Sequence, residues 1–204
     1  MDKAAKRLAV IYVILLSLCA PLMAVHFELF TWFMGVVDMS YWTQTVLWFL
    51  PMLVYGGILV ILGIWNMVKS FQIYKRQDML GCINGMLIHK YGLVIFFCVN
   101  FIVLFLVYFM LTFGLVMGTR GLALLVAPVW LPFVLVMIGW SVIMSWLAIL
   151  PGSMYSIQVI RGSVRAGKIS GGAAVLHGIL QFLFLADVLD AMYLAAGKWG
   201  RGKK

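Results

Sequence analysis

The sequence predicts an all-α integral membrane protein, and two features carry this prediction. Five apolar runs, almost free of charged residues, are separated by short polar segments, and 65% of the 204 residues are hydrophobic while only 10% are charged. Soluble domains carry about 25% charged residues, and an α-helix needs about 20 apolar residues to cross roughly 30 Å of hydrocarbon. We therefore expect a bundle of five hydrophobic helices at residues 8–25, 46–68, 91–119, 122–150 and 173–196.

The first four runs each predict a transmembrane helix within one polytopic membrane domain, residues 1–204. Since domains rarely fall below about 50 residues, no connection is long enough to form a separate aqueous domain. Two connections are basic linkers, residues 69–90 and 151–172. We expect them to form short helices at the membrane surface.

The Lys and Arg residues predict the orientation of the chain. They gather before the first run and in the two basic linkers, whereas residues 26–45 contain Glu28 and Asp38 but no Lys or Arg. Because cytoplasmic loops carry the excess of Lys and Arg, the amino terminus is expected in the cytoplasm, in a bacterial-type inner or plasma membrane.

Length and charge disagree about the last run, residues 173–196. Its 24 residues are long enough to cross, which would place the carboxyl terminus outside with five basic residues and leave ten inside. A re-entrant or surface helix would leave fourteen basic residues inside and one outside, as the charge rule favours. We favour the crossing slightly, because the run is long and because a repeat is suspected.

The suspected repeat is a helical hairpin duplicated in parallel. The second and fourth runs have similar aromatic-Leu-Pro entries at Pro51 and Pro132, and the basic linkers after them lead to His89 and His177 at matching positions. Chance likeness between apolar helices is the alternative. The two histidines could sense pH, or could be hydrogen-bonding residues at helix entries.

Polar residues in the apolar runs are the candidates for function: Asp187, Asp190, His177, Gln181 and Asn100. If the last run crosses, Asp187 lies near mid-membrane, where a charged carboxylate costs a few kcal/mol. No Lys or Arg lies within the expected spans, so burial would favour the protonated carboxyl and a proton-linked site. On one straight helix, however, the two carboxylates lie on a largely different side from His177 and Gln181. They could instead meet water at a membrane edge.

Small residues and basic residues predict contacts with other helices and with lipid. Gly114 and Gly118 form a GxxxG motif, and Ser141 and Ser145 form a second small pair, which favours helix packing within the chain or in a homodimer. The basic residues Arg161, Arg165 and Lys168 recur at helical spacing. We expect them to contact anionic lipid headgroups, or simply to fix the topology.

Motifs for catalysis and nucleotide binding are missing from the sequence. It has no GxxxxGK[ST], HExxH, GxSxG or paired Cys/His ligand set, so we assign no catalytic residue, metal or cofactor. The basic residues follow the topology, so no nucleic-acid partner is expected. Small-solute or proton-linked transport is the favoured function. A non-catalytic scaffold or accessory subunit, with a homodimer or membrane protein as partner, is the alternative, and an intramembrane enzyme a remote third.

Overall fold

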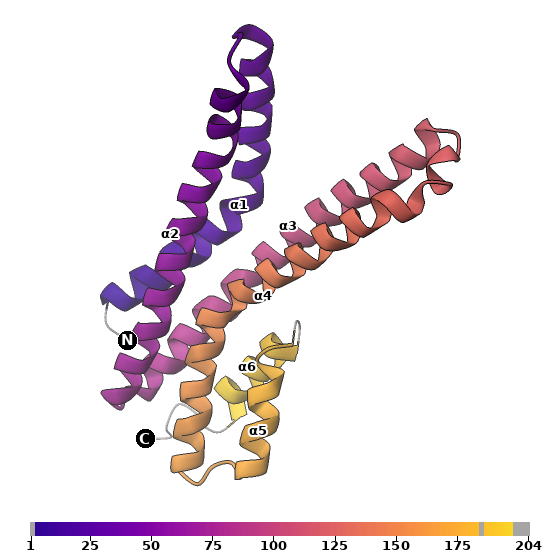
Figure 1. The fold of residues 1–204 in the computed structure, drawn as a ribbon. Helices are drawn as coiled ribbons and strands as arrows, with labels where there is room; N and C mark the ends of the chain where they lie inside the picture. The colour runs from indigo at the N-terminus through magenta and orange to yellow at the C-terminus, as the bar shows by residue number, and fades with distance from the viewer. Residues whose placement is uncertain (1–2, 184–185, 198–204) are drawn as a thin grey trace.

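The computed structural model describes residues 3–183 and 186–197, and every element in these ranges is a helix. Two long antiparallel hairpins make up most of the molecule, and two short helices follow them (Figure 1). The elements are α1 Lys3–Val36, α2 Tyr41–Lys75, α3 Met79–Gly118, the short 3₁₀ helix η1 Leu122–Leu124, α4 Ala127–Arg165, α5 Gly171–Leu180 and α6 Ala186–Gly197.

Four of these helices are long and apolar enough to cross a membrane, among the residues described. They are α1 to α4, with 34 to 40 residues each, whereas about 20 suffice for a crossing. The expected all-α membrane bundle is thus confirmed.

The basic linkers do not form the separate surface helices expected from the sequence. Instead α2 continues to Lys75, α3 begins at Met79 and α4 continues to Arg165. The cause is apolar burial, because Ile73, Ile83 and Val159 in these extensions are almost fully buried. The connection between α2 and α3 is tight, and the Asp78 carboxylate caps α3 by accepting a hydrogen bond from the Gly81 N–H at 2.8 Å.

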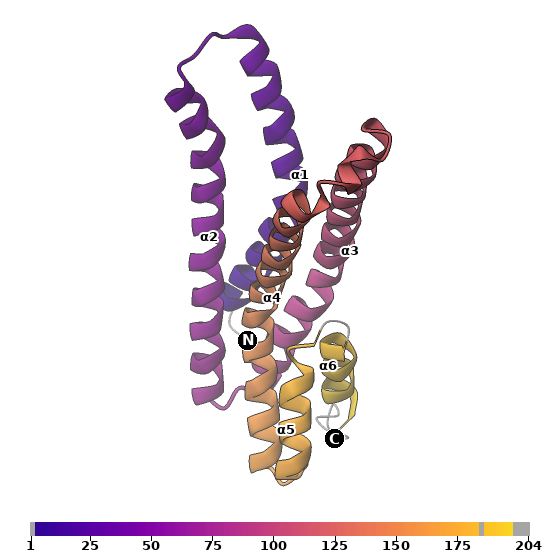
Figure 2. The same cartoon turned by 45° about the vertical axis from the view of Figure 1, so that its right-hand side comes forward.

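The core lies at the end of the molecule where these extensions meet. One buried cluster joins all four long helices and α6. A second cluster, centred on Tyr12 and Leu93, lies farther along α1 and α3. Two glycines allow close helix contact here, because a Cβ at Gly85 would collide with the Tyr155 ring and one at Gly152 would lie 2.9 Å from the His89 Cβ. Beyond the core the α1–α2 and α3–α4 hairpins diverge (Figures 1 and 2).

The last apolar run does not form a single crossing helix, so the preference for a crossing is wrong. It breaks into α5, with 10 residues, and α6, with 12, which at 1.5 Å per residue are only about 15 and 18 Å long. A short turn at Gln181–Leu183 ends α5, and α6 runs back toward the end where α5 begins (Figure 2). The run therefore folds back on itself instead of forming one long helix. The expected outside location of Lys204 concerns a residue beyond those described.

A buried polar network beside an apolar groove

The fold-back of α5 and α6 brings four of the candidate polar residues together. Asp190 of α6 contacts His177 of α5 through one carboxylate oxygen, and its other oxygen accepts a hydrogen bond from the Gln181 side chain. Asp187 lies one turn earlier on α6 and is 3% exposed. On one straight helix the two carboxylates would lie on a different side from His177 and Gln181. Because the chain reverses at Gln181, α6 instead places its carboxylates against α5.

Lys90 of α3 completes the network, and the expectation that Asp187 has no cation near it is wrong. The Lys90 ammonium lies 2.8 Å from Asp187 Oδ2, and the two side chains are only 2% and 4% exposed. It also donates to Ser153 Oγ at 3.1 Å and to the Gln181 carbonyl oxygen at 3.4 Å. All three hydrogens of the ammonium thus have an acceptor within reach.

Sequence reasoning missed Lys90 because the third apolar run was counted from residue 91. The structure begins α3 at Met79, so Lys90 lies three turns inside the helix. The apolar character of residues 79–88 could have indicated this. Ser153 was missed for a similar reason, because residues 151–172 were assigned to a surface linker, whereas Ser153 lies inside α4 and is fully buried.

The network holds one ammonium and two carboxylates. His177 adds a positive charge only when it is protonated, and a neutral imidazole can also donate its Nδ1 hydrogen to Asp190. With a neutral His177 the network carries one excess negative charge. The Gln181 Oε1 atom is buried and has no hydrogen-bond partner, so the network also retains a free acceptor.

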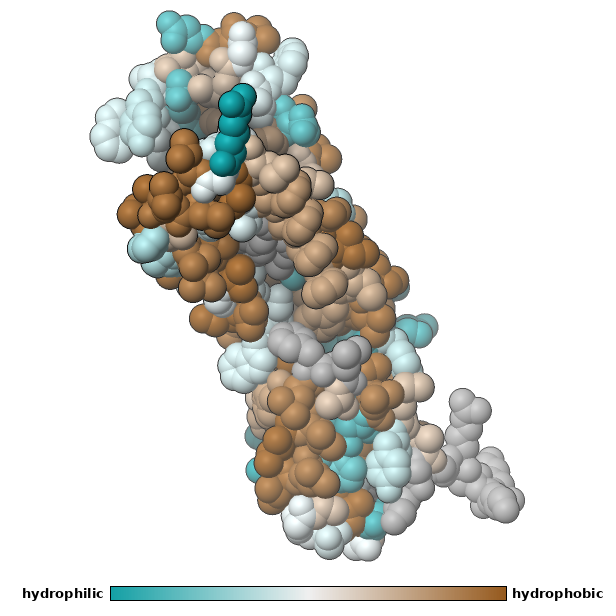
Figure 3. Space-filling view, turned by 90° about the vertical axis from the view of Figure 1, so that its right-hand side faces the viewer, coloured by the Kyte–Doolittle hydropathy of each residue, from teal (hydrophilic) through white to brown (hydrophobic). Residues whose placement is uncertain are grey.

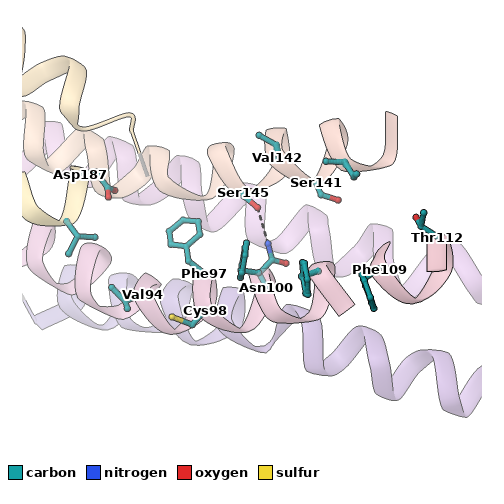
Figure 4. A pocket seen from close by; sticks show the side chains of 14 residues that line it. Val94, Phe97, Cys98, Asn100, Phe109, Thr112, Ser141, Val142, Ser145 and Asp187 are labelled. Carbon is teal, nitrogen blue, oxygen red and sulfur yellow. Dashed lines mark hydrogen bonds between the residues drawn. The ribbon is translucent and has the colours of Figure 1, made fainter. Parts of the chain in front are cut away.

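An apolar groove lies beside the network, between α3, α4 and the start of α6. Its volume is about 880 Å³, and Asp187 forms part of its wall (Figure 4). Four phenylalanines of α3 line it, at positions 97, 101, 105 and 109, and rings from Phe101 to Phe113 stack in sequence along the helix. This side of the molecule is largely apolar, with hydrophilic patches toward its ends (Figure 3).

Asn100 lies in the groove and not in the polar network. Its side-chain nitrogen donates to Ser145 Oγ at 3.0 Å, which joins α3 to α4 (Figure 4). Ser141 lines the same groove. In contrast, a Cβ added at Gly114 or Gly118 would meet no atom within 4 Å, so this GxxxG motif makes no close contact with another helix among the residues described.

The two histidines at matching positions have different surroundings. His89 is fully buried, with its Nδ1 atom 2.8 Å from the Gly85 carbonyl oxygen and its ring stacked on Tyr155 at 5.2 Å between centroids. His177 is partly exposed and contacts Asp190. The helices that carry them also differ, because α3 has 40 residues and α5 has 10.

The expected headgroup residues lie at the carboxyl-terminal end of α4 and just after it. Arg161 and Arg165 are exposed, and the Arg165 guanidinium lies over the Tyr74 ring at 5.3 Å from its centroid, a cation–π contact that joins α4 to α2. Lys168 follows in the connection to α5. Contact with lipid headgroups stays a prediction for these residues.

The fold and the site define a helical integral membrane protein that holds a buried ion pair beside an apolar groove. In the described part of the chain, no group of three or more His, Cys, Asp or Glu side chains could hold a metal ion. The chain belongs to DUF6652, a family of unknown function, whose family model matches residues 3–201. No curated protein and no solved structure is similar enough to count as a match.

Proposed function

We propose that this protein binds and carries a small solute within the membrane, in the groove between α3, α4 and α6. The observation behind this proposal is the buried Lys90–Asp187 ion pair, whose two side chains are almost fully buried and whose Asp187 forms part of the groove wall. Ionisable residues inside a membrane are costly and rare, and they commonly mark a solute or ion path.

The cost of the buried charges supports a functional role. Replacing a buried ion pair by apolar residues of similar size is often neutral or stabilising. Lys90, Asp187 and Asp190 would thus add little to the stability of a bundle that had no other task. They come together only because the last apolar run folds back, which brings α6 to α3. The α5–α6 hairpin is also much shorter than the two other hairpins, with helices of 10 and 12 residues. We propose that its movement relative to α3 and α4 opens and closes the polar end of the groove.

Proton coupling belongs to this proposal in an altered form. An isolated neutral Asp187 no longer motivates it, because Asp187 is paired with Lys90. The group that fits a coupling role is the His177–Asp190 contact, since an imidazole can both accept and release a proton and His177 is the partly exposed member of the network.

Uptake into vesicles tests the transport proposal. Proteoliposomes are given three poorly permeant aromatic solutes: the ethidium cation, neutral 4-methylumbelliferyl glucoside and the 8-anilinonaphthalene-1-sulfonate anion. We expect protein-dependent uptake of at least one of them. Val142→Trp, which fills the groove, should abolish that uptake. The matched control Val136→Trp, at a 68% exposed position of α4 outside the groove, should retain it. Uptake no faster than in empty vesicles for all three solutes would contradict the proposal.

A scaffold role is the second candidate, and the divergence of the two hairpins favours it. Large apolar side chains remain exposed on α2 and α3 beyond the core, including Leu53 at 70% and Phe101 at 71%, and a helix of another membrane protein could cover them. Chemical cross-linking in native membranes tests this. A scaffold predicts one stoichiometric partner linked through cysteines placed on the facing sides of α2 and α3, and a monomer without adducts would contradict it.

A further inference from the structure

We infer that the solute is an amphiphilic cation, an ammonium-like or phosphonium-like charge carried on an apolar or aromatic body. This inference rests on the proposed function and names the class of ligand for the same groove. Both the charge and the shape of the site carry it.

The charge of the polar end selects a cation. Among the residues that the structure describes, Asp187 is the one charged residue that lines the groove, and the network around it holds two carboxylates and one lysine. While His177 is neutral, a bound cation would bring the network to charge balance, and an anion would add a second uncompensated charge in a medium of low dielectric constant. The site is therefore complementary to a positive ligand and opposes a negative one.

Lys90 can release Asp187 without losing all of its partners. Its ammonium also reaches Ser153 Oγ and the Gln181 carbonyl oxygen, so a ligand cation that approaches Asp187 would compete for one of three contacts. The Gln181 side chain donates to Asp190, and its Oε1 atom, which has no partner, is a further acceptor within the network. The network can therefore exchange one cation for another without leaving a carboxylate unpaired.

The walls of the groove fit the apolar part of such a ligand. Phe97 lies between Asp187 and Asn100 (Figure 4), and Phe101, Phe105 and Phe109 follow it along α3 in the lining of the groove. Aromatic faces attract cations, and more strongly when the pair is desolvated. A volume of about 880 Å³ is within the range of small-molecule sites. Val142 and Ser145 of α4 form the facing wall (Figure 4).

Binding of three aryl probes that differ in charge tests the inference. Purified protein in nanodiscs of phosphatidylcholine, which has no net charge, is titrated with tetraphenylphosphonium, with tetraphenylborate and with neutral triphenylphosphine oxide, and empty nanodiscs are subtracted. We expect tetraphenylphosphonium to bind at least tenfold more tightly than either other probe. Asp187→Asn should weaken its binding at least tenfold and leave the neutral probe unchanged.

A second pair of variants keeps the test valid if Asp187→Asn fails to fold. Val142→Trp should weaken cation binding at least tenfold, and Val136→Trp should not change it. Equal or tighter binding of the neutral or anionic probe would overturn the inference and leave the proposed function standing, because the groove would then accept other apolar occupants. If none of the three probes binds, the inference and the proposed function both fail.

Discussion

Removing one member of the Lys90–Asp187 pair should destabilise the protein far more than removing both. At 2.8 Å between Nζ and Oδ2, two unit charges interact by about 6 kcal/mol at an effective dielectric constant of 20, before the cost of burying them is subtracted. Lys90→Met leaves a buried carboxylate without its cation, for which a loss of about 3–5 kcal/mol in the free energy of unfolding is typical. Asp187→Leu leaves a buried ammonium and should cost a similar amount.

The double variant Lys90→Met/Asp187→Leu should recover most of this loss, because apolar side chains of similar size replace the whole pair. The assay is reversible unfolding by SDS in mixed micelles, followed by the fluorescence of the eight tryptophans. We expect a coupling energy of at least about 2 kcal/mol from the four proteins of the cycle. Additive effects, with a coupling below about 0.5 kcal/mol, would refute the ion pair and with it the docking of α6 on α3.

Two further predictions concern the packing of the helices and use the same unfolding assay. Gly85→Ala should destabilise the protein by about 1–3 kcal/mol, since its Cβ would enter the Tyr155 ring. The control is Gly114→Ala, whose added Cβ would meet no atom within 4 Å, and it should be neutral or slightly stabilising. Equal effects of the two variants would contradict the close contact of α3 and α4. Ser145→Ala should cost about 0.6 kcal/mol through loss of the Asn100 hydrogen bond. In an Asn100→Leu background the same change should cost nothing, and an undiminished cost there would show that the bond is absent.

The membrane class and the first four helices could be predicted because the length and apolar composition of each run are local features of the sequence. A run of 20 or more apolar residues has no other favourable solvent than lipid or a membrane protein interior. The ends of the helices could not be predicted in the same way. Charged residues indicate where a helix leaves the lipid, but the helix can continue beyond them. Burial of Ile73, Ile83 and Val159 extends α2, α3 and α4 past the basic residues.

The polar site was predicted in its members but not in its geometry. Asp187, Asp190, His177 and Gln181 stood out as polar residues in an apolar run, and Asn100 was included for the same reason, although it lies in the groove. Their meeting depends on a reversal at Gln181, which no glycine or proline marks between Leu180 and Ala186. The reversal is favoured over a continuous helix by the contact of Asp187 in α6 with Lys90, which lies 97 residues earlier in the chain. Such a long-range contact leaves no local pattern in the sequence.

Labelling of two cysteines tests most directly whether the last apolar run folds back. Cys19, Cys82 and Cys98 are first replaced by alanine, and single cysteines are then placed at Ser170, before α5, and at Ala196, near the end of α6; both positions are exposed. A membrane-impermeant maleimide is added to intact cells and to inverted vesicles. The re-entrant hairpin predicts that both cysteines react from the same side, and labelling from opposite sides would contradict it.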